Sequence, residues 1–265
     1  MSSAGREQAT RPGGFPTEDS SGMKKVLLFD IDGTLVLTGG AGVRAMTMAF
    51  DELFSISDAF RNLPMNGRTD ASILATAAAA HAIPESELGR FPDVYLGHLA
   101  RELEQPGPRK GVMPGVRALL DALAARDDAY LALLTGNYER AAQIKLEHFG
   151  LWRYFPCGAF GNDAPERNAL FPRALARICE CGGPAVDPGE AVVIGDTPLD
   201  VACAVAAGAR SIAVATGSHS VDELRAADVV FADLSDTDAV LDAVLWRKRL
   251  GVEPSPPARA GSDRF

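Results

Sequence analysis

Five short runs of almost continuous apolar residues stand out along the chain, and we expect each to be a buried β-strand. They are Lys25–Asp30, Tyr130–Thr135, Ala191–Gly195, Ser211–Ala215 and Val229–Ala232. Strands of a parallel sheet are covered on both faces, so their side chains are apolar throughout instead of alternating with polar ones. The pattern therefore predicts a mainly parallel sheet.

Segments with helical character separate the later runs. We expect helices over Val116–Ala125, Arg140–Phe149, Arg173–Cys179, Pro198–Ala207 and Val221–Ala227. Alternation of strands and helices is typical of a doubly wound, Rossmann-like α/β fold. In such folds ligands bind at the carboxyl ends of the strands, so the chemistry of this chain is expected there.

An insertion separates the first strand from the second. Residues 39–110 contain no strand-like run, and Val43, Met46 and Phe50 recur there at helical spacing. Further helices are expected over Asp70–His81 and Pro92–Glu104. Glycine and proline are frequent at both ends of the insertion and predict hinges there. The simplest arrangement is a helical cap placed over the sheet.

These patterns divide the chain into a core, a cap and two tails. We assign residues 24–38 and 111–250 to the α/β core, 39–110 to the helical cap, and 1–23 and 251–265 to flexible tails. The tails are polar and rich in proline, a composition that does not form a packed core.

Composition and charge narrow the class of partner. Hydrophobic residues make up 47% of the 265 residues and charged residues 23%, the balance of a globular protein. The formal net charge of −9 disfavours nucleic acid and anionic membranes as partners, because both attract positive surfaces. A small-molecule partner is favoured. A phosphorylated ligand would then need a local positive site, and a divalent cation held by carboxylates can supply it.

Targeting signals and cysteine chemistry are not evident in the sequence. The first 22 residues lack the apolar region of a signal peptide, and no run of 18 apolar residues follows. We therefore expect a soluble, cytoplasmic protein. The spacing of Cys157, Cys179, Cys181 and Cys203 fits neither a zinc ribbon nor a disulfide framework, so reduced thiols are expected.

The first candidate motif directly follows the first strand. Asp30 and Asp32 are separated by one residue and are followed by Gly33, which permits a sharp turn. Successive residues of a strand point to opposite faces, so the two carboxylates approach one point only if the chain turns there. The alternative is that Asp-Gly-Thr only closes a turn.

Two more motifs follow later strands. Asp196 comes directly after the third run, and Asp200 lies four residues further on, about one helical turn away. Asp196 could also be a helix N-cap. Thr135, Gly136 and Asn137 end the second run and offer a hydroxyl and loop N–H groups for a phosphate oxygen.

Together, Asp-x-Asp-Gly-Thr-Leu and a distant Gly-Asp-x-x-x-Asp closely resemble the haloacid dehalogenase-like hydrolases, specifically the phosphoglycolate phosphatase-like branch with a helical cap. The resemblance covers about residues 24–245. It implies that Asp30 is the nucleophile and that Asp32 is the general acid/base. It also implies that Thr135 binds phosphate and that Asp196, supported by Asp200, binds metal.

The resemblance also implies one basic residue ahead of the last acidic motif, usually a lysine. Arg167 occupies the matching position, with Arg173 and Lys145 as the other candidates. Arginine can neutralise the nucleophile and hold phosphate, but as a planar fork instead of a point charge.

The predicted reaction is hydrolysis of a phosphate monoester through an aspartyl-phosphate on Asp30. Asp32 would protonate the leaving alkoxide and later activate water. We expect Mg²⁺ to bind Asp30, a backbone carbonyl near Asp32, Asp196 and Asp200. Oxygens of the phosphoryl group would be held by Thr135, Gly136, Asn137 and Arg167.

Substrate choice is expected to reside in the cap. Arg68, in Gly-Arg-Thr-Asp before a predicted helix, could meet a carboxylate or second phosphate, whereas Thr69 or Asp70 could simply cap that helix. Phosphoglycolate-like compounds or small sugar phosphates are the substrates that the resemblance suggests. A phosphomutase of the β-phosphoglucomutase type remains an alternative, as does a regulatory protein without turnover.

Overall fold

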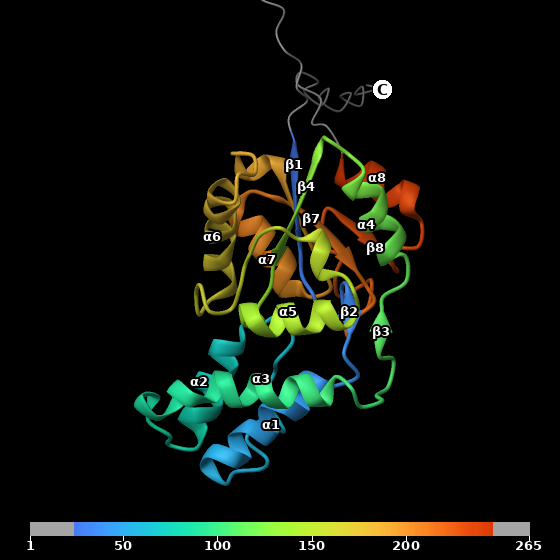
Figure 1. The fold of residues 1–265 in the computed structure, drawn as a ribbon. Coiled ribbons are helices and arrows are strands. Elements are labelled where there is room, and N and C mark those ends of the chain that lie inside the picture. Colours follow the sequence, from blue (N-terminus) through green and yellow to red (C-terminus); the bar gives the residue numbers. More distant parts are fainter. Residues whose placement is uncertain (1–23, 246–265) are drawn as a thin grey trace, which may run out of the picture.

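The computed structural model describes residues 24–245, and a six-stranded sheet forms its centre (Figure 1). The strand order is β5-β4-β1-β6-β7-β8, and every neighbouring pair is parallel. The strands are β1 (Lys25–Phe29), β4 (Ala129–Leu134), β5 (Gly158–Ala159), β6 (Ala191–Gly195), β7 (Arg210–Val214) and β8 (Val229–Phe231). The five predicted strands and the α/β fold class are confirmed.

Side chains of β1 alternate between two hydrophobic layers, as the pleat of a strand requires. Leu27 and Phe29 pack with α4 (Val116–Ala124), α5 (Glu139–His148) and α8 (Thr237–Val244). Val26 and Leu28 pack on the other face with α6 (Arg167–Glu180) and α7 (Pro198–Ala207). The sheet is therefore covered on both sides, which explains why its strands are apolar throughout.

Two helix predictions need correction. The segment Val221–Ala227 forms turns and not a helix. The carboxylate of Glu223 accepts hydrogen bonds from the N–H and the hydroxyl of Ser220, and backbone hydrogen bonds close short turns around Leu224. Helix α6 begins at Arg167, earlier than predicted, and continues through Pro172. Burial of Leu170, Phe171, Ala174 and Ile178 stabilises the helix across that proline.

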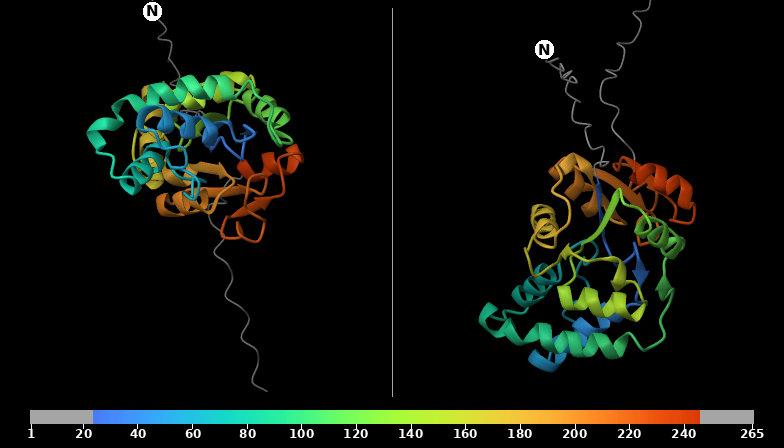
Figure 2. Two further views of the ribbon diagram at one scale, coloured as in Figure 1. Left: turned by 90° about the horizontal axis from the view of Figure 1, so that it is seen from below. Right: turned by 45° about the horizontal axis from the view of Figure 1, so that its top comes forward.

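Residues between β2 (Val36–Leu37) and β3 (Gly111–Val112) form a separate helical layer (Figures 1 and 2). Its helices are α1 (Ala41–Phe54), α2 (Asp70–Ala80), the 3₁₀ turn η1 (Glu85–Arg90) and α3 (Phe91–Glu102). They enclose their own hydrophobic cluster, which includes the stacked rings of Phe91 and Tyr95. We call this layer the cap. Strands β2 and β3 pair antiparallel at its base.

Helix α5 lies between the sheet and the cap (Figure 1). Its Ala141 packs in the cluster of the cap, whereas Ala142 and Leu146 pack in the cluster of the core. Short 3₁₀ turns η2 (Trp152–Tyr154) and η3 (Pro188–Glu190) complete the core. Within residues 24–245, no helix is long and apolar enough to cross a membrane. The predicted tails, residues 1–23 and 251–265, lie outside the described residues, and so do residues 246–250, which were assigned to the core.

Candidate active site

The turn after β1 brings the first acidic motif to the carboxyl edge of the sheet. Asp30 follows β1, and its N–H donates to the carbonyl of Ile194 on β6. Gly33 adopts a φ of +88°, which favours glycine. A Cβ atom on Gly33 would lie 2.3 Å from Oδ2 of Asp196. Glycine at this position therefore permits both the turn and the approach of Asp196.

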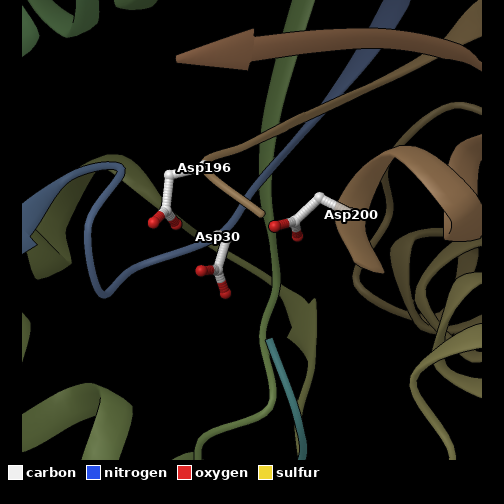
Figure 3. A group of neighbouring side chains, drawn as sticks. All are labelled: Asp30, Asp196 and Asp200. Atoms are coloured by element: carbon white, nitrogen blue, oxygen red, sulfur yellow. The ribbon is translucent and has the colours of Figure 1, made fainter. Parts of the chain in front are cut away.

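Three carboxylates converge at this edge. Asp30 comes from the end of β1, Asp196 from the end of β6 and Asp200 from the first turn of α7, and the three side chains lie close together (Figure 3). One oxygen of each lies within 4.8 Å of the others. Asp200 is held in place by a capping box, in which its Oδ2 accepts from the N–H and hydroxyl of Thr197. Three oxygens placed in this way could hold one cation.

Arg167 is the positive group of this cluster. It is buried at the first residue of α6, and its Nη2 lies 3.1 Å from Oδ1 of Asp30 and pairs with Oδ1 of Asp200. It also donates to the carbonyl of Leu134 at 3.2 Å. Arg173, one of the other candidates, is exposed and lines a separate cavity on the outer face of α6.

The charges of the cluster do not balance without a cation. Burial raises the pKa of Asp30 to about 6, although Arg167 opposes the rise. Burial, and then repulsion from Asp200 and Asp30, raises the pKa of Asp196 to about 9. Burial disfavours the charge of Arg167, yet Asp200 and Asp30 raise the pKa of Arg167 overall. The site therefore holds three carboxylates and one guanidinium. Carboxylate oxygens are the ligands that a hard divalent cation prefers, so the site fits such a cation.

A second group of polar side chains surrounds Asp32. Its Oδ2 accepts from Nδ2 of Asn137 at 2.8 Å and pairs with Nζ of Lys145 at 2.6 Å. Asn137 also donates from Nδ2 to the Thr135 hydroxyl oxygen at 2.9 Å. Thr135, Asn137 and Lys145 are buried. Lys145 entered the sequence analysis only as a substitute for Arg167, but it occupies a different position, on Asp32.

The cap meets the core beside these groups. The N–H of Asp70 donates to the carbonyl of Gly136 at 2.7 Å, and Oδ2 of Asp70 accepts from the N–H of Tyr138 at 2.9 Å. Thr69 donates to the carbonyl of Pro165 at 2.7 Å. Burial raises the pKa of Asp70 to about 6, although the positive charge of Lys145 opposes this. Sequence analysis missed this double contact because it treated Asp70 only as a helix cap.

Arg68 lies at the same junction, but its guanidinium turns back along the cap. It donates to the carbonyl of Ser72 at 3.3 Å and to the hydroxyl of Thr76 at 2.9 Å, both on α2. Thr69 is the N-cap of α2, as the alternative interpretation of this segment proposed. Arg68 lines the cavity next to the acids, but its donors are engaged within the cap.

A cavity of about 140 Å³ lies between the carboxyl edge of the sheet and the cap. The core contributes polar side chains to its wall, and the cap contributes apolar ones together with the polar side chains of Asn66, Arg68 and Asp70. Core residues in the wall include Asp30, Asp32, Asn137, Lys145 and Arg167, and cap residues include Val43, Met46, Met65, Ile73 and Tyr95. A small anionic ligand suits the charged core side of this cavity.

Comparison with known proteins identifies the family to which the chain belongs. The profile of the haloacid dehalogenase-like hydrolases matches residues 24–208. The chain therefore belongs to this family, and the predicted class of enzyme, a hydrolase of the phosphatase type, is confirmed.

Individual relatives share the family and the fold. A phosphoglycolate phosphatase from Rhodospirillum rubrum is 34% identical over 205 residues, which cover 74% of this chain and 81% of that protein. A predicted phosphoglycolate phosphatase from Haemophilus somnus 129PT superimposes with a TM-score of 0.60 at 22% identity and covers 82% of this chain and 97% of its own. A β-phosphoglucomutase from Clostridium difficile gives a TM-score of 0.62 at 15% identity, with 84% and 97% covered. The two structures show a common fold.

Proposed function

We propose that this chain is a magnesium-dependent phosphatase that hydrolyses a small phosphate monoester through an aspartyl-phosphate intermediate. The observation that carries the proposal is the convergence of Asp30, Asp196 and Asp200 around one point, with Arg167 paired to two of them. An anionic nucleophile reaches an anionic phosphoryl group only where positive charge offsets their repulsion. This site has both the acids to hold a cation and a fixed guanidinium.

The acids and Thr135 have distinct roles in the proposed reaction. Asp30 attacks phosphorus in line with the leaving oxygen, and Asp32 gives that oxygen a proton. Asp32 then removes a proton from the water that hydrolyses the aspartyl-phosphate, so it acts first as acid and then as base. Arg167, the hydroxyl of Thr135 and the N–H of Gly136 hold phosphoryl oxygens.

Asp30, Asp196 and Asp200 are the proposed magnesium ligands, together with a backbone carbonyl near Asp32. Mg²⁺ prefers oxygen donors, and each of these groups supplies one. When bound, the ion neutralises charge on the phosphoryl group and polarises it. The high pKa of Asp196 supports this assignment, because such crowding of carboxylates is relieved by a cation.

For the substrate we propose phosphoglycolate or a similarly small phosphorylated metabolite. The name of the Rhodospirillum rubrum relative supports phosphoglycolate. The small volume of the cavity, about 140 Å³, supports a compact leaving group. Measuring phosphate release from a panel of monoesters at fixed Mg²⁺ concentration tests the choice, and phosphoglycolate is expected among the fastest.

Asp30→Asn tests the mechanism. The amide is not a nucleophile, so turnover should fall by at least about a thousandfold while the circular dichroism spectrum stays that of a folded protein. Asp127→Asn, at an exposed position away from the cavity, is the matched control and should keep full activity. Near-normal turnover in a folded Asp30→Asn protein would rule out the covalent mechanism.

Product analysis separates the proposed function from its alternatives. A phosphatase releases inorganic phosphate, a phosphomutase returns the phosphoryl group to another hydroxyl of a sugar, and a regulatory protein does neither. Inorganic phosphate is the expected product from every substrate that the chain accepts.

A further inference from the structure

Lys145 and Asn137 form a closed arrangement of hydrogen bonds on one oxygen of Asp32. Both donate to Oδ2, from Nζ at 2.6 Å and from Nδ2 at 2.8 Å. Nζ of Lys145 also donates to Oδ1 of Asn137 at 2.5 Å, so the two donors fix each other. Among residues 24–245, no group donates a hydrogen bond to Oδ1 of Asp32. One carboxylate oxygen is therefore clamped and the other is left for the cavity that Asp32 lines.

The two members of the ion pair differ sharply in exposure. The side chain of Asp32 is 41% exposed, whereas that of Lys145 is 5% exposed. Burying an ammonium group is unfavourable unless partners replace its water, and a surface ion pair would contribute little. A buried lysine that donates to Asp32 and Asn137 holds those groups more firmly than a solvated lysine would.

Helix α5 explains why the ammonium group of Lys145 stays in place. The helix is packed by Ala141 against the cap and by Leu146 against the core, so it is fixed on two sides. Gly42 of the cap lies alongside, and a Cβ atom there would be 3.6 Å from Nζ. The position of Nζ therefore depends on both the sheet and the docked cap.

We propose that Lys145 is a positioning residue, which with Asn137 orients the carboxylate of Asp32 so that Oδ1 is the atom that exchanges the proton. The inference rests on the proposed function, in which Asp32 is the general acid. In the first step a carboxylate oxygen of Asp30 bonds to phosphorus while the bond between phosphorus and the leaving oxygen breaks. The electron pair of the broken bond stays on the leaving oxygen, and the proton on Oδ1 of Asp32 moves to it. Proton transfer requires hydrogen-bond distance, so a carboxyl group that rotates freely loses part of its effect.

Leaving groups of different basicity test this inference. Phosphate release is measured for a series from 4-nitrophenyl to 4-methoxyphenyl phosphate, and kcat/KM is compared because it reports the first chemical step. A basic leaving group needs the proton from Asp32, and a stable phenolate does not. Lys145→Met should lower kcat/KM by at least about tenfold for 4-methoxyphenyl phosphate and by less than about threefold for 4-nitrophenyl phosphate.

Arg140→Met is the matched control, because it removes a positive charge from an exposed position of the same helix. It should keep the wild-type dependence on the leaving group. Where Lys145→Met does not fold, Lys145→Gln replaces it. Glutamine keeps a hydrogen-bond donor, one bond shorter and without the charge, so a smaller change in the same direction is expected.

An equal loss for all leaving groups in a folded Lys145 variant would overturn the inference and leave the proposed function intact. A wild-type protein that releases phosphate from no ester would instead overturn the proposed function, and the inference with it.

Discussion

Asp196→Asn tests the electrostatics of the site through stability instead of activity. Burial and the neighbouring Asp200 and Asp30 raise the pKa of Asp196 from 3.8 to about 9 in the folded, metal-free chain. In the unfolded chain the same carboxyl group is ionised at neutral pH. Folding therefore takes up a proton, and the free energy of unfolding of the metal-free protein should fall as pH rises between these two values.

The magnitude follows from the span of pH. About three pH units separate pH 7 from the unfolded pKa of 3.8, and each corresponds to about 1.4 kcal/mol. Keeping Asp196 neutral at pH 7 thus costs up to about 4 kcal/mol, a cost that an asparagine does not have. We expect Asp196→Asn to stabilise the metal-free protein by about 2 to 4 kcal/mol, which raises Tm by at least about 4 °C in a chain of this size.

Thermal unfolding in EDTA at pH 5.5, 7.0 and 8.5 is the assay. The Tm difference between Asp196→Asn and wild type should widen with pH, and Mg²⁺ should raise the Tm of the wild type but hardly that of the variant. Asp127→Asn, at an exposed position, should follow the wild type. A variant that melts below wild type in EDTA, or a difference that does not change with pH, would refute the reasoning.

Three further outcomes can be checked with the same protein. Arg167→Met leaves Asp30 and Asp200 without their buried partner and should lower the free energy of unfolding by about 3 to 5 kcal/mol in urea titrations; Arg167→Lys should recover part of this. Gly33→Ala places a methyl group against Asp196 and should raise the Mg²⁺ concentration for half-maximal activity at least about tenfold, with a strain cost of about 1 to 2 kcal/mol. EDTA should abolish turnover of the wild type, and excess Mg²⁺ should restore it; activity that survives chelation would contradict the assigned ligands.

The sequence was sufficient to predict five of the six strands of the sheet and the acids that follow β1 and β6. Runs such as Ala191–Gly195 are apolar at every position, a pattern that only burial on both faces demands. The edge strand β5 was not predicted, because two residues, Gly158 and Ala159, carry no periodicity. The false helix at Val221–Ala227 has the composition of a helix, but local side-chain caps stabilise turns there.

The site was predictable only in part, because tertiary contacts that local motifs do not encode bring its residues together. Motifs identify Asp30 and Asp196, but their proximity depends on β1 and β6 being neighbours in the sheet, which no local pattern encodes. Lys145 lies on a helix whose spacing is that of an ordinary amphipathic segment. Its contact with Asp32 arises from the packing of α5 between the core and the cap, a tertiary arrangement that sequence spacing does not reveal.

The short antiparallel pair of β2 and β3 joins the cap to the core, and we call this pair the neck. Val36 faces Val112 and Leu37 faces Gly111 in register, and Gly39 lies against Gly107 just beyond them. The two connections between core and cap therefore form one hydrogen-bonded ribbon and not two separate segments. Since this neck already has the geometry of a hairpin, a two-residue turn in place of the helices would leave the path of the core chain unbroken. We therefore expect that caps of other sizes could be exchanged at this neck without a change in the strand order of the sheet.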